Sequence, residues 1–409
     1  MKKTKMKRVP KLRFPEFTDD WEQRKLSEVT SMHARIGWQN LRTSEFLDSG
    51  DYMLITGTDF NDGAINFSTC HYVERDRYEQ DRNIQIHNGS ILITKDGTLG
   101  KVAYVQGLSM PATLNAGVFN VQIKDANIVD EKYLFQYLKA PFLMDYVGKK
   151  ATGGTIKHLN QSILVDFPVI LPQKSEQIRI GAFFQQLDHL ITLHQRKLEK
   201  LKELKKGLVQ KLFSQEVRFK ADDGSEFPKW EEKRLSGLFG KVIEKNRLDL
   251  PALTIIQGYG TIRRDESERK ITYDEKGLKN YKAVQKDDFI VHLRSFEGGL
   301  EIANQDGIVS PAYHVYRGND EVHPLFYYPY FRSSSFIKGK LAVCVTGVRD
   351  GKNIEMGAFD ELLIPHPCLA EQQKIAECLS ALDDVIEKQK ATLAAWEELK
   401  KGLLQQMFV

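Results

Sequence analysis

Cysteine is scarce in this sequence, and its four residues, Cys70, Cys344, Cys368 and Cys378, are far apart. None belongs to a Cys-x-x-Cys pair, and no cluster of histidines and cysteines has the spacing of zinc ligands. We therefore expect no metal site. The cysteines are interpreted as buried or incidental thiols in a reducing compartment.

Long apolar runs and an excess of one charge are absent too. No stretch of about 18 apolar residues occurs, which excludes a membrane-spanning helix. Met1–Pro10 is basic but no apolar segment follows, so it does not read as a secretory signal, and a cytoplasmic protein is predicted. The 59 basic and 55 acidic residues leave a net charge of +4, which neither demands nor excludes a nucleic acid partner.

The motifs of common catalytic and cofactor sites are also missing. The two glycines of Gly97–Lys101 are too close together for a phosphate-binding loop. Gly258–Gly260 lacks the third glycine of a dinucleotide loop, and Ser310–Tyr313 departs at two of four positions from the Asn-Pro-Pro-Tyr loop of amino-methyltransferases. No nucleophile and base signature stands out. We expect no catalytic residue and no cofactor in this chain.

What the sequence does contain is an internal repeat. The segment Pro172–Ser214 aligns without a gap to Pro367–Val409, and Glu203–Leu208 recurs as Glu398–Leu403. With 409 residues, 41% of them hydrophobic and 10% aromatic, the chain is long enough for two or more domains with real cores. The repeat indicates a duplication.

A shorter match opens each half of the chain. Trp21–Ser27 resembles Trp230–Ser236, and the pair Arg13-Phe14 recurs as Arg218-Phe219. The blocks between opener and repeated segment, roughly 28–171 and 237–366, show little similarity to each other. One duplicated frame with two divergent inserts predicts one architecture that carries two different specificities.

Heptad spacing predicts a long helix with an apolar seam in each repeated segment. The seam rows are Phe184, Ile191, Leu198, Lys205, Leu212 with Ile180, Leu187, His194, Leu201, Leu208, and Leu379, Ile386, Leu393, Lys400, Met407 with Ile375, Leu382, Gln389, Trp396, Leu403. We expect the two helices to pair as an antiparallel coiled coil, which would relate the halves by a pseudo-two-fold axis. The polar seam residues would fix the register. Gly207 and Gly402, inside the helical pattern, suggest a close backbone approach or a bend.

The two divergent blocks read as mixed α/β domains, which makes the predicted fold class α+β. Short strands separated by Gly- and Asp-rich turns are expected at Tyr52–Ile55, Ser90–Ile93, Val102–Val105, Val118–Ile123, Val165–Ile170, Ala252–Ile256, Phe289–Leu293, Ala312–Tyr316 and Leu362–Ile364. Short helices are expected at Glu131–Lys139 and Pro324–Phe331. The predicted domains are 1–171 and 216–366, and the long helices are 172–215 and 367–409.

Many short strands with polar, glycine-rich turns make a domain that presents loops. Arginine and lysine side chains can bind guanine edges or phosphates, and asparagine and glutamine side chains can bind adenine. The candidate DNA-binding residues near such turns are Arg35, Gln39, Asn40, Lys95, Thr98, Lys101, Lys149, Lys150 and Lys157 in the first block, and Arg263, Arg264, His292, Arg294, Ser295, Arg349 and Lys352 in the second. The prediction concerns the loops as sets, since any single one of these can be a solvated surface residue.

The whole arrangement resembles the specificity subunit of type I restriction-modification systems. The resemblance depends on the Arg-Phe-Pro-Glu-Phe…Trp-Glu opener at 13–22 with its echo at 227–231, the Pro-x₃-Glu-Gln starts at 172–177 and 367–372, and the repeated Glu-Leu-Lys-Lys-Gly-Leu ending. It covers essentially the whole chain. A final variation, Lys211-Leu212-Phe213 against Gln406-Met407-Phe408, changes nothing essential.

The resemblance implies a non-catalytic subunit with two target-recognition domains, each reading one half of a split double-stranded DNA sequence. It implies paired helices that act as a ruler and bind two methyltransferase subunits, which use S-adenosylmethionine to methylate adenine. Motor-nuclease subunits would join through the complex. An alternative stays open, a non-catalytic coiled-coil adaptor with two protein-recognition domains. A nuclease is disfavoured by the missing motifs.

Overall fold

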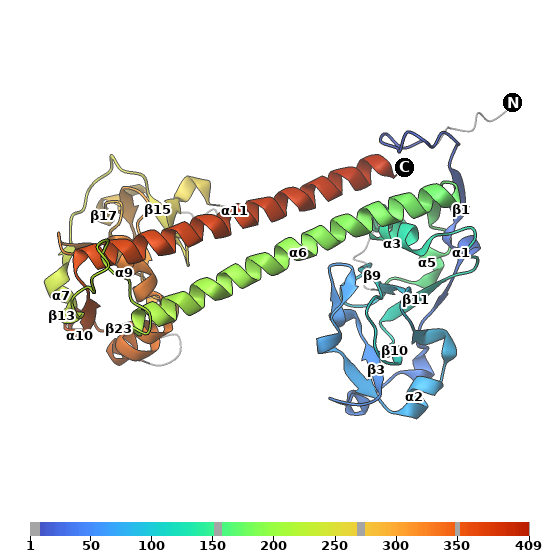
Figure 1. Ribbon diagram of the computed structural model, residues 1–409, viewed down its shortest axis with the longest axis horizontal. Coiled ribbons are helices and arrows are strands. Elements are labelled where there is room, and N and C mark those ends of the chain that lie inside the picture. Colours follow the sequence, from blue (N-terminus) through green and yellow to red (C-terminus); the bar gives the residue numbers. More distant parts are fainter. Residues whose placement is uncertain (1–8, 151–157, 268–274, 348–351, 409) are drawn as a thin grey trace. The chain divides into compact units, whose positions relative to one another are not determined.

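The computed structural model describes residues 9–150, 158–267, 275–347 and 352–408 (Figure 1). The chain divides into two compact units, Met1–Gln195 with Thr392–Val409, and Arg196–Ala391. Each unit combines a mixed α/β domain with part of each of two long helices, α6 (Lys174–Phe213) and α11 (Leu369–Met407). The predicted mixed fold with long helices is therefore confirmed.

The first unit holds twelve strands and five shorter helices among the residues that the structure describes. The strands are β1 (Glu22–Lys25), β2 (Thr30–His33), β3 (Tyr52–Ile55), β4 (Phe60–Asn61), β5 (Ala64–Ile65), β6 (His71–Val73), β7 (Gln85–Ile86), β8 (Ile91–Thr94), β9 (Val102–Tyr104), β10 (Ala112–Leu114), β11 (Val118–Ile123) and β12 (Pro168–Leu171). The helices are α1 (Leu26–Val29), α2 (Arg75–Glu79), α3 (Glu131–Lys139), α4 (Phe142–Lys150) and α5 (Gln161–Leu164).

The second unit is built from the same kinds of element. Its described strands are β13 (Glu231–Arg234), β14 (Phe239–Val242), β15 (Leu253–Ile256), β16 (Gly260–Arg263), β17 (Lys282–Val284), β18 (Phe289–Val291), β19 (Glu301–Ile302), β20 (Gly307–Val309), β21 (His314–Gly318), β22 (Val345–Thr346), β23 (Asn353–Ile354) and β24 (Leu363–His366). Its helices are α7 (Leu235–Leu238), α8 (Ser295–Gly298), α9 (Pro324–Phe331) and α10 (Met356–Asp360).

The main strands of the two domains pair in the same order, although their sequences differ. One sheet has the order β2-β11-β8-β9 in the first unit and β14-β21-β18-β19 in the second. The other has the order β6-β3-β10-β7, in which β3 and β10 are parallel. In the second unit β15 pairs with β16 and β20 with β17, and a parallel bridge from Ala252 to Ile308 joins the two pairs. The internal repeat thus extends to the divergent blocks.

The repeated Glu-Gln pair ties the start of each long helix to its own domain. Glu176 is fully buried and accepts hydrogen bonds from Arg13, while Gln177 accepts one from the Asp130 backbone N–H and donates to the Pro172 carbonyl. In the second unit, fully buried Glu371 accepts from Arg218, and Gln372 accepts from the His323 N–H and donates to the Pro367 carbonyl. Buried carboxylates and amides require such partners, which explains why the openers repeat together with the helix starts.

Within each unit the two long helices pack side by side and run in opposite directions. In the first unit the Phe184 ring lies 5.6 Å from that of Phe408 and the His194 ring lies 6.2 Å from that of Trp396, between ring centroids. In the second, Leu212 shares a buried apolar cluster with Ile375 and Leu379.

The two glycines of the helical pattern do not mark a close backbone approach, because a side chain added at Gly207 or Gly402 would meet no described atom within 4 Å. Of the two alternatives, the close backbone approach is therefore wrong.

Two of the polar seam residues, Lys205 and Lys400, form equivalent ion pairs. Lys400 pairs with Asp188 in the first unit, and Lys205 pairs with Asp383 in the second. Each pair joins α6 to α11 at a fixed level. Because an ion pair at one level disfavours helices shifted along each other, these lysines favour a single register.

Candidate nucleic-acid interface

Three loops of the first domain meet at one edge of its sheets. One follows β3, one connects β8 to β9, and one connects β10 to β11. The Lys95 N–H donates to the Gly117 carbonyl and the Asn115 N–H donates to the Ile55 carbonyl, each over 2.9 Å, so backbone bonds hold the loops together. They surround a cavity of about 390 Å³ lined by Phe46, Thr56, Gly57, Thr58, His71, Asp96, Gly97, Thr98, Asn115 and Gly117. Hydroxyl, amide and carboxylate groups around a hollow can bind the edge of a base.

Three predicted residues, Lys95, Thr98 and Lys101, belong to the β8–β9 loop. Thr98 is exposed and lines the cavity. Lys101 is also exposed, and its N–H donates to the Thr94 hydroxyl over 3.0 Å. The Lys95 ammonium lies 5.6 Å from the centroid of the Phe119 ring. The structure brings these three residues together on one closed turn.

The remaining first-domain predictions lie elsewhere. Lys149 and Lys150 are exposed at the end of α4, where Lys149 lines a different hollow together with residues of β1 and β12. Asn40 is exposed, and Lys157 lies outside the described residues.

Arg35 and Gln39 are corrections, because both are buried, at 1% and 4% exposure. The Arg35 guanidinium donates to the Leu114 carbonyl over 2.9 Å and to the Gln80 side chain over 3.0 Å. Burial lowers its pKa, and the neighbouring Arg77 lowers it further. Both side chains stabilise the loop from inside and are not available to a duplex.

In the second domain, predicted and unpredicted residues form a continuous chain of contacts. The Arg264 guanidinium lies 5.5 Å from the centroid of the Tyr281 ring, and the neighbouring Lys282 ammonium donates to the Tyr313 carbonyl. The Tyr313 ring lies 6.3 Å from the His292 ring, and His292 Nδ1 accepts from the Arg294 N–H over 3.2 Å. We call Arg264, Tyr281, Lys282, His292, Arg294 and Tyr313 the basic cluster.

Burial and, after it, neighbouring cations lower the pKa values of basic groups in and around the basic cluster. Burial lowers the pKa of Lys282, and Lys245 lowers it further. Burial also lowers the pKa of His314, with added effects of Lys282 and Lys241. Burial lowers the pKa of His292, with a further contribution from Arg332. Because cations raise the cost of protonating one another, an anion placed here would be stabilised.

The other second-domain predictions divide into exposed and buried residues. Arg263 is exposed and pairs with Asp265 over 2.8 Å. Lys352 is exposed, with its ammonium 5.7 Å from the centroid of the Phe296 ring, and Arg349 lies outside the described residues. Ser295 is a correction. It is fully buried, and its hydroxyl accepts from the His292 N–H over 2.9 Å, so it shapes the loop.

Sequence reasoning missed Lys245, Tyr281, Lys282 and Tyr313. The pairs Tyr281-Lys282 and Tyr313-His314 place an aromatic side chain beside a basic one, which is a signal for nucleic acid contacts that the sequence contains. Their approach to Arg264 and His292 depends on strand pairing between β17 and β20 and between β18 and β21, which the sequence alone did not reveal.

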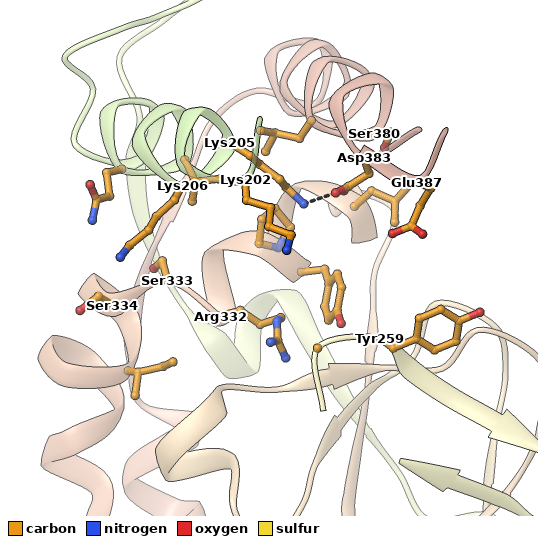
Figure 2. Close-up of a pocket in the computed structure, with 18 of the residues that line it drawn as sticks. Lys202, Lys205, Lys206, Tyr259, Arg332, Ser333, Ser334, Ser380, Asp383 and Glu387 are labelled. Atoms are coloured by element: carbon orange, nitrogen blue, oxygen red, sulfur yellow. Dashed lines mark hydrogen bonds and ion pairs between the residues drawn. The ribbon is translucent and has the colours of Figure 1, made fainter. Parts of the chain in front are cut away.

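The second unit also has a cavity of about 730 Å³ between α6, α9 and α11 (Figure 2). Lys202, Lys205 and Lys206 come from α6, whereas Asp383 and Glu387 come from α11. Arg332 follows α9 and points toward the same space.

Within the described ranges, no helix has the length and apolar character to cross a bilayer, and no three His, Cys, Asp or Glu side chains gather as metal ligands would.

Two α/β domains with one topology and different loop chemistry, each followed by a long helix, define a two-part recognition protein. A profile of the type I restriction modification DNA specificity domain matches residues 18–203 and again residues 228–395. The chain therefore belongs to the type I restriction-modification DNA specificity family, whose members are non-catalytic subunits that recognise the DNA target.

Two archaeal relatives support this assignment over most of the chain. A protein described as the specificity subunit of the type I restriction enzyme MjaX, from Methanocaldococcus jannaschii, is 26% identical over 95% of this chain and 93% of its own length. The MjaVIII specificity subunit of the same organism is 27% identical over 79% of both chains.

Solved structures agree at the level of the fold. The type I restriction-modification S subunit from M. genitalium matches with a TM-score of 0.57 and 15% identity, over 98% of this chain and 99% of that one. A chain from a structural study of the assembly and conformational transition of the type I system matches with a TM-score of 0.54 and 15% identity, over 95% and 97%. At these identities the match concerns the fold alone.

Proposed function

We propose that the two domains, 1–171 and 216–366, each read one half of a split double-stranded DNA target through the loops described above. The observation that carries this proposal is the shared strand order with different side chains at equivalent loops. The β8–β9 loop presents Lys95, Thr98 and Lys101, whereas the equivalent β18–β19 loop presents His292 and Arg294. A common frame with different groups at the same edge is suited to reading two different sequences.

In the second domain, the basic cluster provides the two kinds of contact that such recognition needs. Lys282 and Arg264 are half-buried cations held by tyrosines, which suits them to fixed phosphate contacts. Arg294 is exposed, and among the described residues its side chain forms no ion pair. Its guanidinium group is therefore free to donate hydrogen bonds to the edge of a base.

The long helices supply matched surfaces for two methyltransferase subunits, which we assign one to each unit. In the first unit Leu190 and Leu399 flank the Lys400–Asp188 pair and are 37% and 47% exposed. In the second, Val385 and Leu204 flank the equivalent Lys205–Asp383 pair and are 45% and 60% exposed. Exposed apolar residues beside a helix seam favour the docking of partner helices.

The complex then divides its chemistry among its subunits. The methyltransferase subunits supply S-adenosylmethionine and adenine methylation, the motor-nuclease subunits join through them, and this chain carries no cofactor. The assembly acts in the cytoplasm, where the DNA that it recognises is located.

Filter binding to duplex DNA tests this proposal, with the chain assembled with its methyltransferase partners. Replacing Arg264 and Lys282 by glutamine should weaken binding to all sequences and reduce the slope of log affinity against log salt by about 1.8. Arg263→Gln is the matched control, because its charge is already compensated by Asp265, and should change the slope less. An assembly that binds duplex DNA no better than a scrambled competitor, but captures a protein through these loops, would favour the adaptor.

A further inference from the structure

The β18–β19 loop presents an apolar and a cationic side chain next to each other. Leu293 is 66% exposed, and the adjacent Arg294 is exposed as well. A single exposed leucine on a protein surface needs no explanation. Leu293 differs because it lies inside the basic cluster, between His292 and Arg294. A duplex bound to the basic cluster would cover its side chain.

Leu293 and Arg294 lie on a turn whose two ends are joined by hydrogen bonds. The His292 N–H donates to the Ser295 hydroxyl over 2.9 Å, and the Ser295 N–H donates back to the His292 carbonyl over 3.0 Å. Gly299 ends the turn at a φ of 82°, and a side chain there would lie 2.2 Å from the Phe331 carbonyl oxygen. The turn therefore cannot shift freely, and a rigid loop loses little entropy when it binds.

The chemistry of this pair matches two features of the major groove. An arginine fork donates to guanine O6 and N7, and an apolar side chain contacts the C5-methyl group of thymine. Resting on the function proposed above, we propose that this loop reads a guanine through Arg294 and the methyl group of a neighbouring thymine through Leu293.

The first domain provides an internal contrast. At the equivalent β8–β9 loop the apolar residue is Leu99, which is half-buried and packs against the domain core, while exposed Thr98 offers a hydroxyl. A contact between a leucine of this loop and the thymine methyl group is therefore expected only in the half-site that the second domain reads.

Modified DNA tests the proposal directly. After the target is mapped from methylated adenines, each thymine is replaced in turn by deoxyuridine, which lacks only the methyl group, and the affinity of the full complex is measured. One thymine of the second half-site should weaken binding about fourfold, as expected for one buried methyl group. Leu293→Ala should weaken binding to the thymine target by the same factor and have no further effect on the deoxyuridine target.

The arginine is tested in the same way with 7-deazaguanine, which lacks N7. Substitution of one guanine beside that thymine should weaken binding on the order of tenfold, and Arg294→Ala should remove the sensitivity. Leu363→Ala, at an equally apolar residue of β24 that is 44% exposed, is the control and should leave both sensitivities unchanged.

Several outcomes would overturn the inference while leaving the proposed function in place. These are a second half-site without a guanine beside a thymine, a Leu293→Ala variant that weakens thymine and deoxyuridine targets equally, and an Arg294→Ala variant that weakens all sequences alike with a smaller salt slope. Failure of the assembled complex to bind any specific duplex would instead contradict the proposed function itself.

Discussion

The two ion pairs that join the long helices occupy equivalent positions but have different surroundings. In the first unit, Lys400 is only 10% exposed, and Asp188 also accepts a hydrogen bond from the Gln136 amide over 2.6 Å, with the Lys139 ammonium 3.8 Å away. In the second unit, Asp383 is 52% exposed and faces the cavity of Figure 2. The repeat fixes which groups pair, while the neighbouring helix decides how buried the pair is.

The difference arises from α3 and α9, which the repeat places at equivalent positions. Gln177 binds the Asp130 N–H and Gln372 binds the His323 N–H, so residue 130 corresponds to residue 323. On this alignment Gln136 corresponds to Pro329, which has no amide to donate.

Lys139 corresponds to Arg332, which lines the same cavity as Asp383 but pairs with a different carboxylate. The Arg332 guanidinium pairs with Glu301 and lies 5.5 Å from the centroid of the Tyr328 ring. Neither equivalent side chain therefore fills the space beside Asp383, and a cavity remains.

The largest expected effect distinguishes the two pairs. Asp188→Asn should lower the free energy of unfolding by about 3–5 kcal/mol, because it leaves the Lys400 ammonium buried without its counter-ion. Asp383→Asn should cost only about 0–1 kcal/mol, because solvent screens the exposed pair. Urea unfolding of both variants measures the two values, and equal losses would show that burial does not separate the pairs.

A substitution in α9 should make the second pair more like the first. Pro329→Gln restores an amide at the position of Gln136 and removes a proline from inside a helix. We expect a gain of about 0.5–1.5 kcal/mol from the hydrogen bond, in addition to what removal of the proline contributes. The same change in an Asp383→Ala background should gain less, and an equal gain there would mean that only the backbone responds.

The smallest effect is a pH dependence of the second unit. Burial is the main cause that lowers the pKa values of His292, His314 and His366 below the ordinary value of 6.5. Between each lowered pKa and 6.5 the unfolded chain binds protons that the folded chain does not, so the free energy of unfolding rises with pH through this window and levels off above it.

Hydrogen exchange of peptides from the second unit, compared between pH 5.5 and pH 7.5 after correction for the intrinsic rate, measures this dependence. His314→Gln should reduce it. Exchange that slows toward acid pH would contradict the assignment.

Local patterns in the sequence were sufficient for much of the fold. The predicted ranges Glu131–Lys139, Pro324–Phe331 and Val118–Ile123 are the bounds of α3, α9 and β11. Their periodicity is local, so neighbouring residues determine it. The duplicated frame was equally visible, because the Glu-Gln pair and the openers form buried hydrogen bonds that constrain both copies.

The candidate site was predicted less completely, because it depends on burial and long-range contacts. Arg35 and Arg294 both stand near turns, yet Arg35 is enclosed by Leu114 and Gln80, which are far away in sequence. Lys282 joins the site only through strand pairing. Turn chemistry indicated which loops to consider, but could not indicate which side chains point outward.

Methylation mapping after a domain exchange tests the central claim most directly. Residues 28–171 are replaced by the equivalent block of a relative, the chain is assembled with its methyltransferase subunits, and methylated adenines are located on plasmid DNA. If each domain reads its own half of the target, one half-site changes and the other is kept. A map in which both halves change, or neither does, would contradict the division of recognition between the two domains.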